Sequence, residues 1–195
     1  MNYKVLVLMA DGFEDVEAVT PIDYLSRAGS EVITASVKNS REQCDGENLI
    51  VTSKWGGIKL IADTTLTELV KQGKYDFDAV IIPGGIPGAL NLAASEEANE
   101  LIKEMAAAGK LICAICASPA VVLAPLGLIS GRNYTCYPGF EEKVKDGKWS
   151  AERVVVDGNI ITSRGAGTAG LFSIAIINKL FGESTGKRIA NTLLL

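Results

Sequence analysis

The alternation of short apolar runs with segments of helix length is the feature that most constrains how this chain folds. Residues 5–9, 79–82 and 111–115 are continuous apolar runs of strand length. Helical patterns at 14–28 and 96–108 lie between such runs, and a glycine follows each of them. Strands that are apolar on both faces are typical of parallel sheets covered by helices on both sides. The sequence therefore predicts an α/β fold with a doubly wound, mostly parallel sheet.

The rest of the chain continues this pattern. Further strands are expected at 31–37, 49–53, 58–61, 134–136, 154–157 and 160–162, and further helices at 66–71, 117–123, 167–180 and 187–194. Gly158-Asn159 is a turn dipeptide, so the last two strands are expected to form a hairpin. No linker, repeat or low-complexity stretch interrupts the 195 residues. We expect one flavodoxin-like domain that spans residues 1–195.

Composition excludes several classes of function. The chain contains no histidine, so it has no Ser-His-Asp triad, no Cys-His pair and no His-ligated metal. The net charge is −4 and the basic residues are scattered, which disfavours a nucleic-acid partner. No apolar run approaches the ~18 residues that span a bilayer, and Asp11 and Glu14 interrupt the first run too early for a signal peptide. We expect a cytoplasmic protein with reduced cysteines and with no cofactor, metal or membrane partner.

Ligands of doubly wound sheets bind at the carboxyl ends of the strands, so the candidate site follows positions 9, 82, 115 and 136. Cys116 ends one predicted strand, and Ala117-Ser118-Pro119 opens a helix. This corner has the geometry of a nucleophile elbow. Backbone N–H groups and the helix dipole beside the sulfur favour the thiolate and lower the pKa of the cysteine. The alternative interpretation is a buried structural cysteine.

Two other loops reach the same edge of the sheet. Gly84 and Gly85 allow the backbone to approach a ligand, and a free N–H there can bind an oxyanion, unless the segment is simply a tight turn. Asp15 is expected to cap the first helix, and Glu17, one turn in, to face the sheet. Burial raises the pKa of a carboxyl and keeps it protonated, so Glu17 is a candidate acid and base beside Cys116.

Two motifs suggest other functions that their context disfavours. The G-x-G-x-x-G at 165–170 follows a strand and opens a helix, but no further strand remains for a ribose-binding acid, so we expect only a tight turn. Cys113 and Cys116 form a C-x-x-C, yet Cys113 belongs to the apolar strand, whereas redox pairs open a helix. Zinc would need Cys44, Cys136 or carboxylates as further ligands.

Taken together, these loops resemble the ThiJ/PfpI superfamily, and most of all its DJ-one branch with its bacterial homologues. The matching stretches cover nearly the whole chain: G-F-E-D-V-E-A-V-T-P-I-D (12–23), R-A-G (27–29), Y-D-F-D-A-V-I-I-P-G-G (75–85), A-I-C-A-S-P (114–119) and T-S-R-G-A-G-T (162–168). The resemblance implies a flavodoxin-like fold of the class I glutamine amidotransferase-like type and a homodimer.

The resemblance also implies roles for individual residues. Cys116 would be the oxidation-prone nucleophile, and Glu17 the protonated carboxyl hydrogen-bonded to its sulfur. Gly85 and Ala117 would supply backbone N–H donors, and Arg27 would lie near the pocket or the dimer interface. The implied function is a glutathione-independent glyoxalase or deglycase acting on small reactive carbonyls such as methylglyoxal. The alternative is an oxidative-stress sensor or protective chaperone that works through oxidation of Cys116.

The sequence departs from the family pattern in two places. Tyr137 stands where many relatives carry histidine, and a phenol can donate a hydrogen bond but is a poor base near neutral pH. The Cys-His pair of superfamily proteases and amidotransferases is therefore excluded. The loop at 38–48 is longer than in the closest relatives, and we assign no role to Cys44. Cys136, in the strand predicted after the elbow helix, is a candidate resolving thiol for Cys116.

Overall fold

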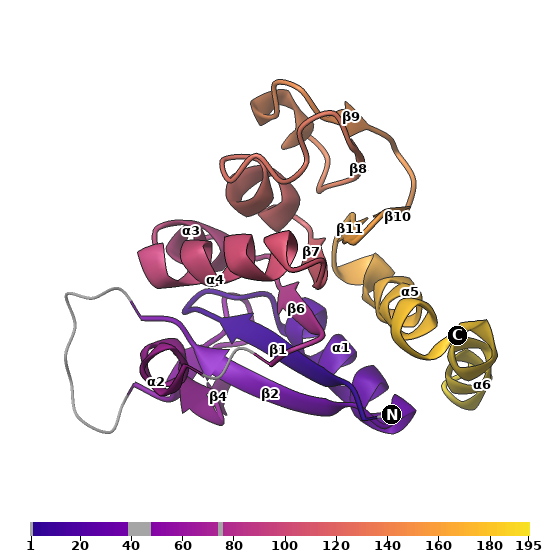
Figure 1. Ribbon diagram of the computed structural model, residues 1–195, viewed down its shortest axis with the longest axis horizontal. Coiled ribbons are helices and arrows are strands. Elements are labelled where there is room, and N and C mark those ends of the chain that lie inside the picture. The colour runs from indigo at the N-terminus through magenta and orange to yellow at the C-terminus, as the bar shows by residue number, and fades with distance from the viewer. Residues whose placement is uncertain (1, 39–47, 74–75) are drawn as a thin grey trace.

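A seven-stranded sheet forms the centre of the computed structural model, which describes residues 2–38, 48–73 and 76–195 (Figure 1). In spatial order its strands are β10 (Val154–Asp157), β11 (Ile160–Ser163), β7 (Leu111–Ile115), β6 (Ala79–Ile82), β1 (Lys4–Met9), β2 (Glu31–Ser36) and β5 (Thr64–Thr65). All neighbours are parallel except the β10–β11 hairpin. The prediction of a flavodoxin-like, mostly parallel sheet is confirmed.

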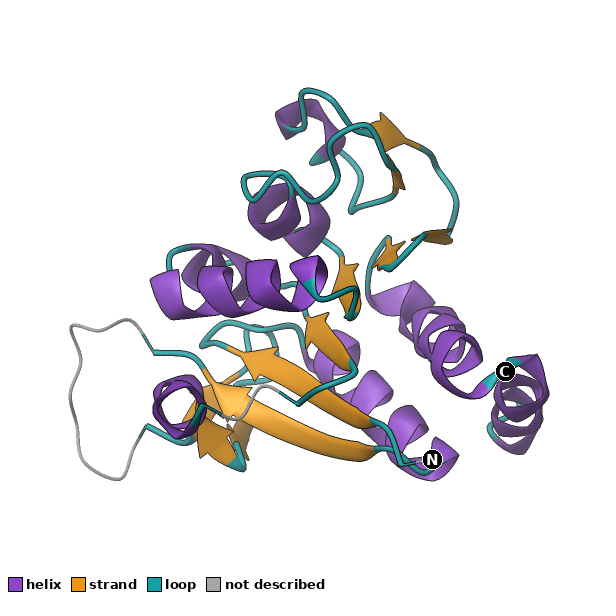
Figure 2. Cartoon of the chain, in the orientation of Figure 1, coloured by secondary structure: helices purple, strands orange, loops and turns teal. Residues whose placement is uncertain are grey.

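Helices cover both faces of this sheet (Figure 2). One face packs against α1 (Asp15–Ala28), α5 (Ala169–Phe181) and α6 (Glu183–Thr192). The other packs against α2 (Leu66–Gln72), α3 (Gly88–Ala93), α4 (Glu96–Ala107) and the π-helix η1 (Pro119–Leu123). Along β1, Leu6 and Leu8 join the second cluster, while Val5, Val7 and Met9 join the first. Because successive side chains alternate between two buried faces, the strand has to be apolar throughout.

The long elements begin and end close to where the sequence placed them. Gly29, with φ of 101°, ends α1 in the left-handed conformation that favours glycine. Ser95 caps α4, since its hydroxyl accepts a hydrogen bond from the Ala98 N–H at 3.2 Å. None of the helices within the described ranges is both long and apolar enough to cross a bilayer.

The predicted strand at 134–136 is wrong beyond its first residue. The observed strand β8 (Asn133–Tyr134) pairs with β9 (Lys148–Trp149) in a separate two-stranded sheet. The next N–H, that of Thr135, donates to the Thr162 hydroxyl at 2.9 Å, so it joins no backbone ladder. Cys136 therefore follows β8 in a segment outside any strand.

Several short elements were not predicted: β5, α3, β9 and the 3-10 turns η2 (Glu141–Lys143) and η3 (Ala166–Thr168). Each is too short to show a helical or strand period in the sequence. The strands β3 (Ile50–Thr52) and β4 (Lys59–Ile61), which were expected, form an antiparallel pair apart from the main sheet. Of the loop expected at 38–48, only Lys38 and Asn48 lie within the described residues, and Cys44 lies outside them.

Candidate functional site

The chain turns sharply at Cys116, directly after β7. The residue has φ of 65°, and among the described residues only Leu194 shares a positive φ without being glycine. Such a conformation costs a cysteine roughly 1–3 kcal/mol and persists only where neighbours enforce it. Here the Cys116 N–H donates to the Ser163 carbonyl at 2.9 Å, and its carbonyl accepts from the Tyr137 N–H at 2.8 Å. The strained corner matches the predicted nucleophile elbow.

Glu17 points from α1 into the protein and is only 1% exposed. Its Oε2 accepts a hydrogen bond from the Gly84 N–H at 2.9 Å. The helix cap differs from the prediction, because the Glu14 carboxylate, and not that of Asp15, accepts the Glu17 N–H at 2.8 Å. Glu14 thus fixes the helical turn from which the Glu17 side chain leaves. The prediction that Glu17 faces the sheet is confirmed.

Burial governs the protonation of Glu17. Desolvation raises the pKa of this carboxyl to about 7, and the negative charge of Glu14 adds to the rise. Contacts with the Cys116 side chain and with the N–H groups of Gly84 and Ala166 oppose the rise only in part. The carboxyl therefore keeps its proton in acid solution and loses it close to neutral pH.

Opposing effects act on the pKa of the Cys116 thiol. Burial and the charge of Glu17 raise the pKa of the thiol to about 12, although the N–H groups of Gly85 and Ala117 donate to the sulfur and lower it. The prediction of a low pKa for Cys116 is thus wrong. It considered the helix dipole and the N–H donors, but not the cost of burying a charged sulfur. Repulsion by Glu17 acts only when that carboxyl is ionised. A thiolate at Cys116 is therefore compatible with a neutral Glu17 and not with a charged one.

The two glycines after β6 lie where no side chain fits. A Cβ on Gly84 would come within 2.5 Å of both the Cys116 Cβ and Glu17 Oε2. Gly85 has φ of +88°, and a Cβ there would lie 2.5 Å from the Gly12 carbonyl oxygen. The absence of side chains lets this backbone approach the sulfur and the carboxyl together. The structure thus brings Cys116, Glu17, Gly84, Gly85 and Ala117 into one site.

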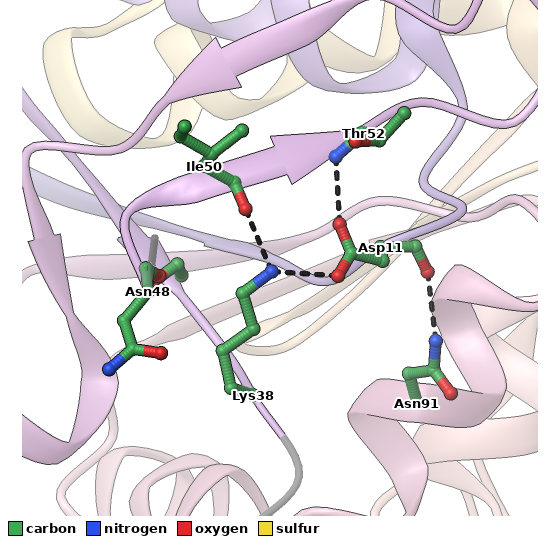
Figure 3. A network of polar contacts seen from close by, with 7 residues as sticks. Asp11, Lys38, Asn48, Ile50, Thr52 and Asn91 are labelled. Carbon is green, nitrogen blue, oxygen red and sulfur yellow. Dashed lines mark hydrogen bonds and ion pairs between the residues drawn. The ribbon is translucent and has the colours of Figure 1, made fainter. Parts of the chain in front are cut away.

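A polar network holds the first loop of the site in place (Figure 3). The Asp11 carboxylate accepts from Lys38 Nζ at 2.7 Å and from the Thr52 N–H at 2.8 Å. Lys38 Nζ also donates to the Ile50 carbonyl at 2.7 Å. On the other side, the Asn91 side chain donates to the Asp11 carbonyl at 2.8 Å. The network joins β3 and α3 to the residue that precedes Gly12.

This anchored loop contacts the glycine loop directly. The Glu14 N–H donates to the Gly84 carbonyl at 3.1 Å, and the Gly88 N–H donates to the Gly12 carbonyl at 3.1 Å. The Asp11 network therefore helps to hold in place the glycine loop that carries the Gly85 N–H. Sequence reasoning missed this network because its members are up to 80 residues apart, and each is an ordinary surface residue by itself.

Gly165 lies beside both the Tyr137 ring and Glu17 Oε1. A Cβ on Gly165 would lie 3.3 Å from the Tyr137 ring and 3.7 Å from Glu17 Oε1. As predicted, the glycine motif makes a tight turn, η3, between β11 and α5. The turn also brings the Ala166 N–H close enough to Glu17 to lower the pKa of its carboxyl, which the sequence did not reveal.

Arg27 lies away from the site. It is in the last turn of α1, exposed, with its Nε bonded to the Asp23 carboxylate at 2.8 Å. Ten residues separate it from Glu17, which is about 15 Å along a helix. The expectation that Arg27 lies near the pocket is therefore wrong, while a role at a dimer interface stays a prediction.

The other two described cysteines are fully buried. Cys113 packs inside β7, as expected for a core residue. Cys136 belongs to the cluster under α4 and η1, whereas Cys116 packs against the cluster under α1 and α5. This packing gives a thiol exchange between Cys116 and Cys136 no support, and the resolving role stays a prediction.

Comparisons with known proteins agree with this geometry. The model of the DJ-1/PfpI family matches residues 3–179. The chain is 40% identical over 98% of its length to the protein named DJ-1 homolog B of Arabidopsis thaliana, and 35% identical over 83% to a deglycase of Pyrococcus abyssi (strain GE5 / Orsay), of which it covers 89%. A solved structure of Toxoplasma gondii DJ-1, oxidized, superimposes with a TM-score of 0.88 at 38% identity, with 98% of each chain covered. The chain spans only 41% and 46% of two Arabidopsis relatives.

The raised pKa of Glu17 makes folding stability depend on pH. An unfolded glutamate has a pKa of 4.5 and the folded one about 7, so the contribution of Glu17 to the free energy of unfolding is greatest below pH 4.5. It falls by about 3 kcal/mol as the pH rises through 7, because the unfolded chain binds fewer protons there. We expect Glu17→Gln, which does not titrate, to lack this fall. Urea denaturation of both proteins between about pH 4 and pH 8 measures it, and a stability difference that stays constant over this range would contradict the raised pKa.

Proposed function

Since this chain belongs to the DJ-1/PfpI family, we propose that it is a glutathione-independent enzyme of the glyoxalase or deglycase type. Its substrates would be small reactive dicarbonyls such as methylglyoxal, and it would need no cofactor. The observation that carries the proposal is the convergence of the Glu17 carboxyl and the Gly85 and Ala117 N–H groups on the Cys116 sulfur. A relative named a deglycase supports the same class of activity.

The proposed reaction begins with addition of the Cys116 thiolate to the aldehyde carbon of methylglyoxal. The Gly85 and Ala117 N–H groups stabilise the negative oxygen, and Glu17 protonates it to give a hemithioacetal. The Glu17 carboxylate then removes the hydrogen from the former aldehyde carbon as a proton, which leaves an enediolate. Return of that proton to the neighbouring carbon, together with transfer of the hydroxyl proton from the first oxygen to the second, gives a thioester of lactate. Water hydrolyses the thioester, releases lactate and restores the thiol.

This mechanism predicts that both side chains are required for turnover. Cys116→Ser and Glu17→Gln should each lower lactate formation from methylglyoxal, measured without glutathione, by at least about 100-fold, since each removes a group that bonds to the reacting atoms. Arg27→Ala, exposed and distant from the site, is the matched control and should keep wild-type turnover. Wild-type rates in Cys116→Ser would overturn the proposal. The result also shows whether turnover proceeds with Tyr137 in place of the family histidine.

The second candidate function is an oxidative-stress sensor or protective chaperone. Cys116 is the one described cysteine with an exposed surface, since Cys113 and Cys136 are fully buried. Its N–H donors and a protonated Glu17 would stabilise a sulfinate. A relative has been solved in a form described as oxidized. Like the enzyme, such a sensor fits the reducing cytoplasm, where we place the protein.

Mild hydrogen peroxide distinguishes the fates of Cys116. Two peroxide molecules would each transfer one oxygen to the sulfur and leave as water, so intact mass should rise by two oxygens in the wild type and not in Cys116→Ser. A loss of two daltons, absent in Cys136→Ser, would instead show a disulfide with Cys136. The sensor is favoured if wild type lacks methylglyoxal turnover while Cys116 alkylates rapidly at neutral pH. No mass change under peroxide would contradict it.

We also propose that the protein is a homodimer. Large apolar side chains are exposed on α1 and on the adjoining β3–β4 segment, namely Val16, Val19, Trp55, Ile58 and Ile61. The two elements are neighbours, since Ser53 pairs with Phe13 and the Lys54 N–H donates to the Phe13 carbonyl at 2.9 Å. A group of large exposed apolar side chains on neighbouring elements is typical of a protein interface.

Val19→Glu is expected to convert the dimer into a monomer, because it places a charge on the apolar surface of α1 that the interface would bury. Val156→Glu is the matched control, since Val156 is similarly exposed but lies on the edge strand β10. Light scattering coupled to size-exclusion chromatography gives the molar mass. A wild-type monomer, or a dimer that survives in Val19→Glu, would contradict this interface.

A further inference from the structure

We propose that Tyr137 is an aromatic wall of the Cys116 site and makes aromatic 2-oxoaldehydes, of which phenylglyoxal is the simplest, the preferred substrates. The inference rests on the proposed function and adds to it a substrate class and the residue that selects it. Tyr137 occupies the position that the family resemblance assigns to histidine, so the role has to follow from the chemistry of a phenol ring.

The backbone fixes Tyr137 beside the nucleophile. Its N–H donates to the Cys116 carbonyl at 2.8 Å, so the two residues are held together across the strained elbow. A rigid backbone contact of this kind defines where the side chain starts. The Tyr137 side chain therefore starts beside Cys116, although Tyr137 lies 21 residues further along the chain.

The ring and the Cys116 sulfur both lie close to the Glu17 carboxyl. A Cβ on Gly165 would sit 3.3 Å from the Tyr137 ring and 3.7 Å from Glu17 Oε1, so ring and oxygen are within about 7 Å of each other. On the other side, a Cβ on Gly84 would touch both Glu17 Oε2 and the Cys116 Cβ at 2.5 Å. A substrate bonded to Cys116 and reached by Glu17 would therefore extend beside the residues that border the carboxyl, and the Tyr137 ring is one of them.

The Tyr137 ring packs against another aromatic ring and is also partly exposed to solvent. Phe140 meets it edge-on, with centroids 6.3 Å apart and planes at 82°. Half of Tyr137 is nevertheless exposed. An aromatic pair between the ring and a substrate contributes about 0.5–1.5 kcal/mol beyond the burial of area, which corresponds to a rate preference of about twofold to 13-fold. Methylglyoxal carries a methyl group in place of a ring, so it cannot form an aromatic pair with Tyr137.

The test is the ratio of kcat/KM for phenylglyoxal to that for methylglyoxal. Tyr137→Phe keeps the ring and should keep the wild-type ratio, whereas Tyr137→Ala should lower it about twofold to 13-fold. A ratio unchanged in Tyr137→Ala would overturn the inference. A ratio lost already in Tyr137→Phe would also overturn it, because the hydroxyl and not the ring would then select the substrate.

A second measurement keeps this inference separate from the proposed function. Phenacyl bromide and bromoacetone both alkylate thiols, and only the first carries a ring. The ratio of their rates at Cys116, read by mass spectrometry, should fall in Tyr137→Ala and stay in Tyr137→Phe whether or not the protein turns over dicarbonyls. If methylglyoxal is not turned over but this ratio falls as expected, the proposed function fails and the aromatic wall stands; if methylglyoxal is turned over and neither ratio falls, only the wall fails.

Discussion

The contact between the buried Glu17 carboxyl and the Cys116 sulfur is the interaction on which the rest of the site depends. Glu17 is fully buried and Cys116 partly buried, and burial raises the pKa of each group, to about 7 and about 12 respectively. Because the carboxyl and the sulfur are in hydrogen-bond contact, two negative charges there would repel each other strongly in a medium of low dielectric. The pair can therefore carry one charge and one proton near neutral pH, and the reactivity of the sulfur depends on which group holds the proton.

The surrounding backbone is arranged around that pair. Gly84 donates its N–H to the carboxyl and leaves no side chain to separate it from the sulfur. Glu14 caps α1 and donates its own N–H to the Gly84 carbonyl, so one residue positions both partners. The Asp11–Lys38 ion pair then fixes the loop that carries Glu14. The strain at Cys116 and the burial of the carboxyl both reduce stability, and the hydrogen bonds of this framework hold the two groups in place against that cost.

How far the sequence predicts the structure depends on the range of the interactions. The strands and long helices follow from local periodicity, and Cys116, Glu17 and Gly85 could be grouped because carboxyl ends of parallel strands meet at one edge. The Ala166 contact and the Asp11 network join distant loops, which no local pattern encodes. The segment after Tyr134 was misread since its apolar residues resemble a strand, although the Thr135 N–H bonds to a side chain. The pKa of Cys116 was misjudged because burial is a property of the finished fold.

The absence of histidine gives the raised pKa of Glu17 its significance. An imidazole titrates near pH 6.5 without perturbation, so it exchanges protons readily at neutral pH, whereas an ordinary carboxyl titrates more than two units lower. Burial moves the pKa of Glu17 to about 7, into the range where an imidazole would act. Burial thus gives this chain, which has no histidine, a side chain that exchanges protons near neutral pH. Under the proposed mechanism, Tyr137 has no proton to transfer, which leaves its ring free to contact the substrate.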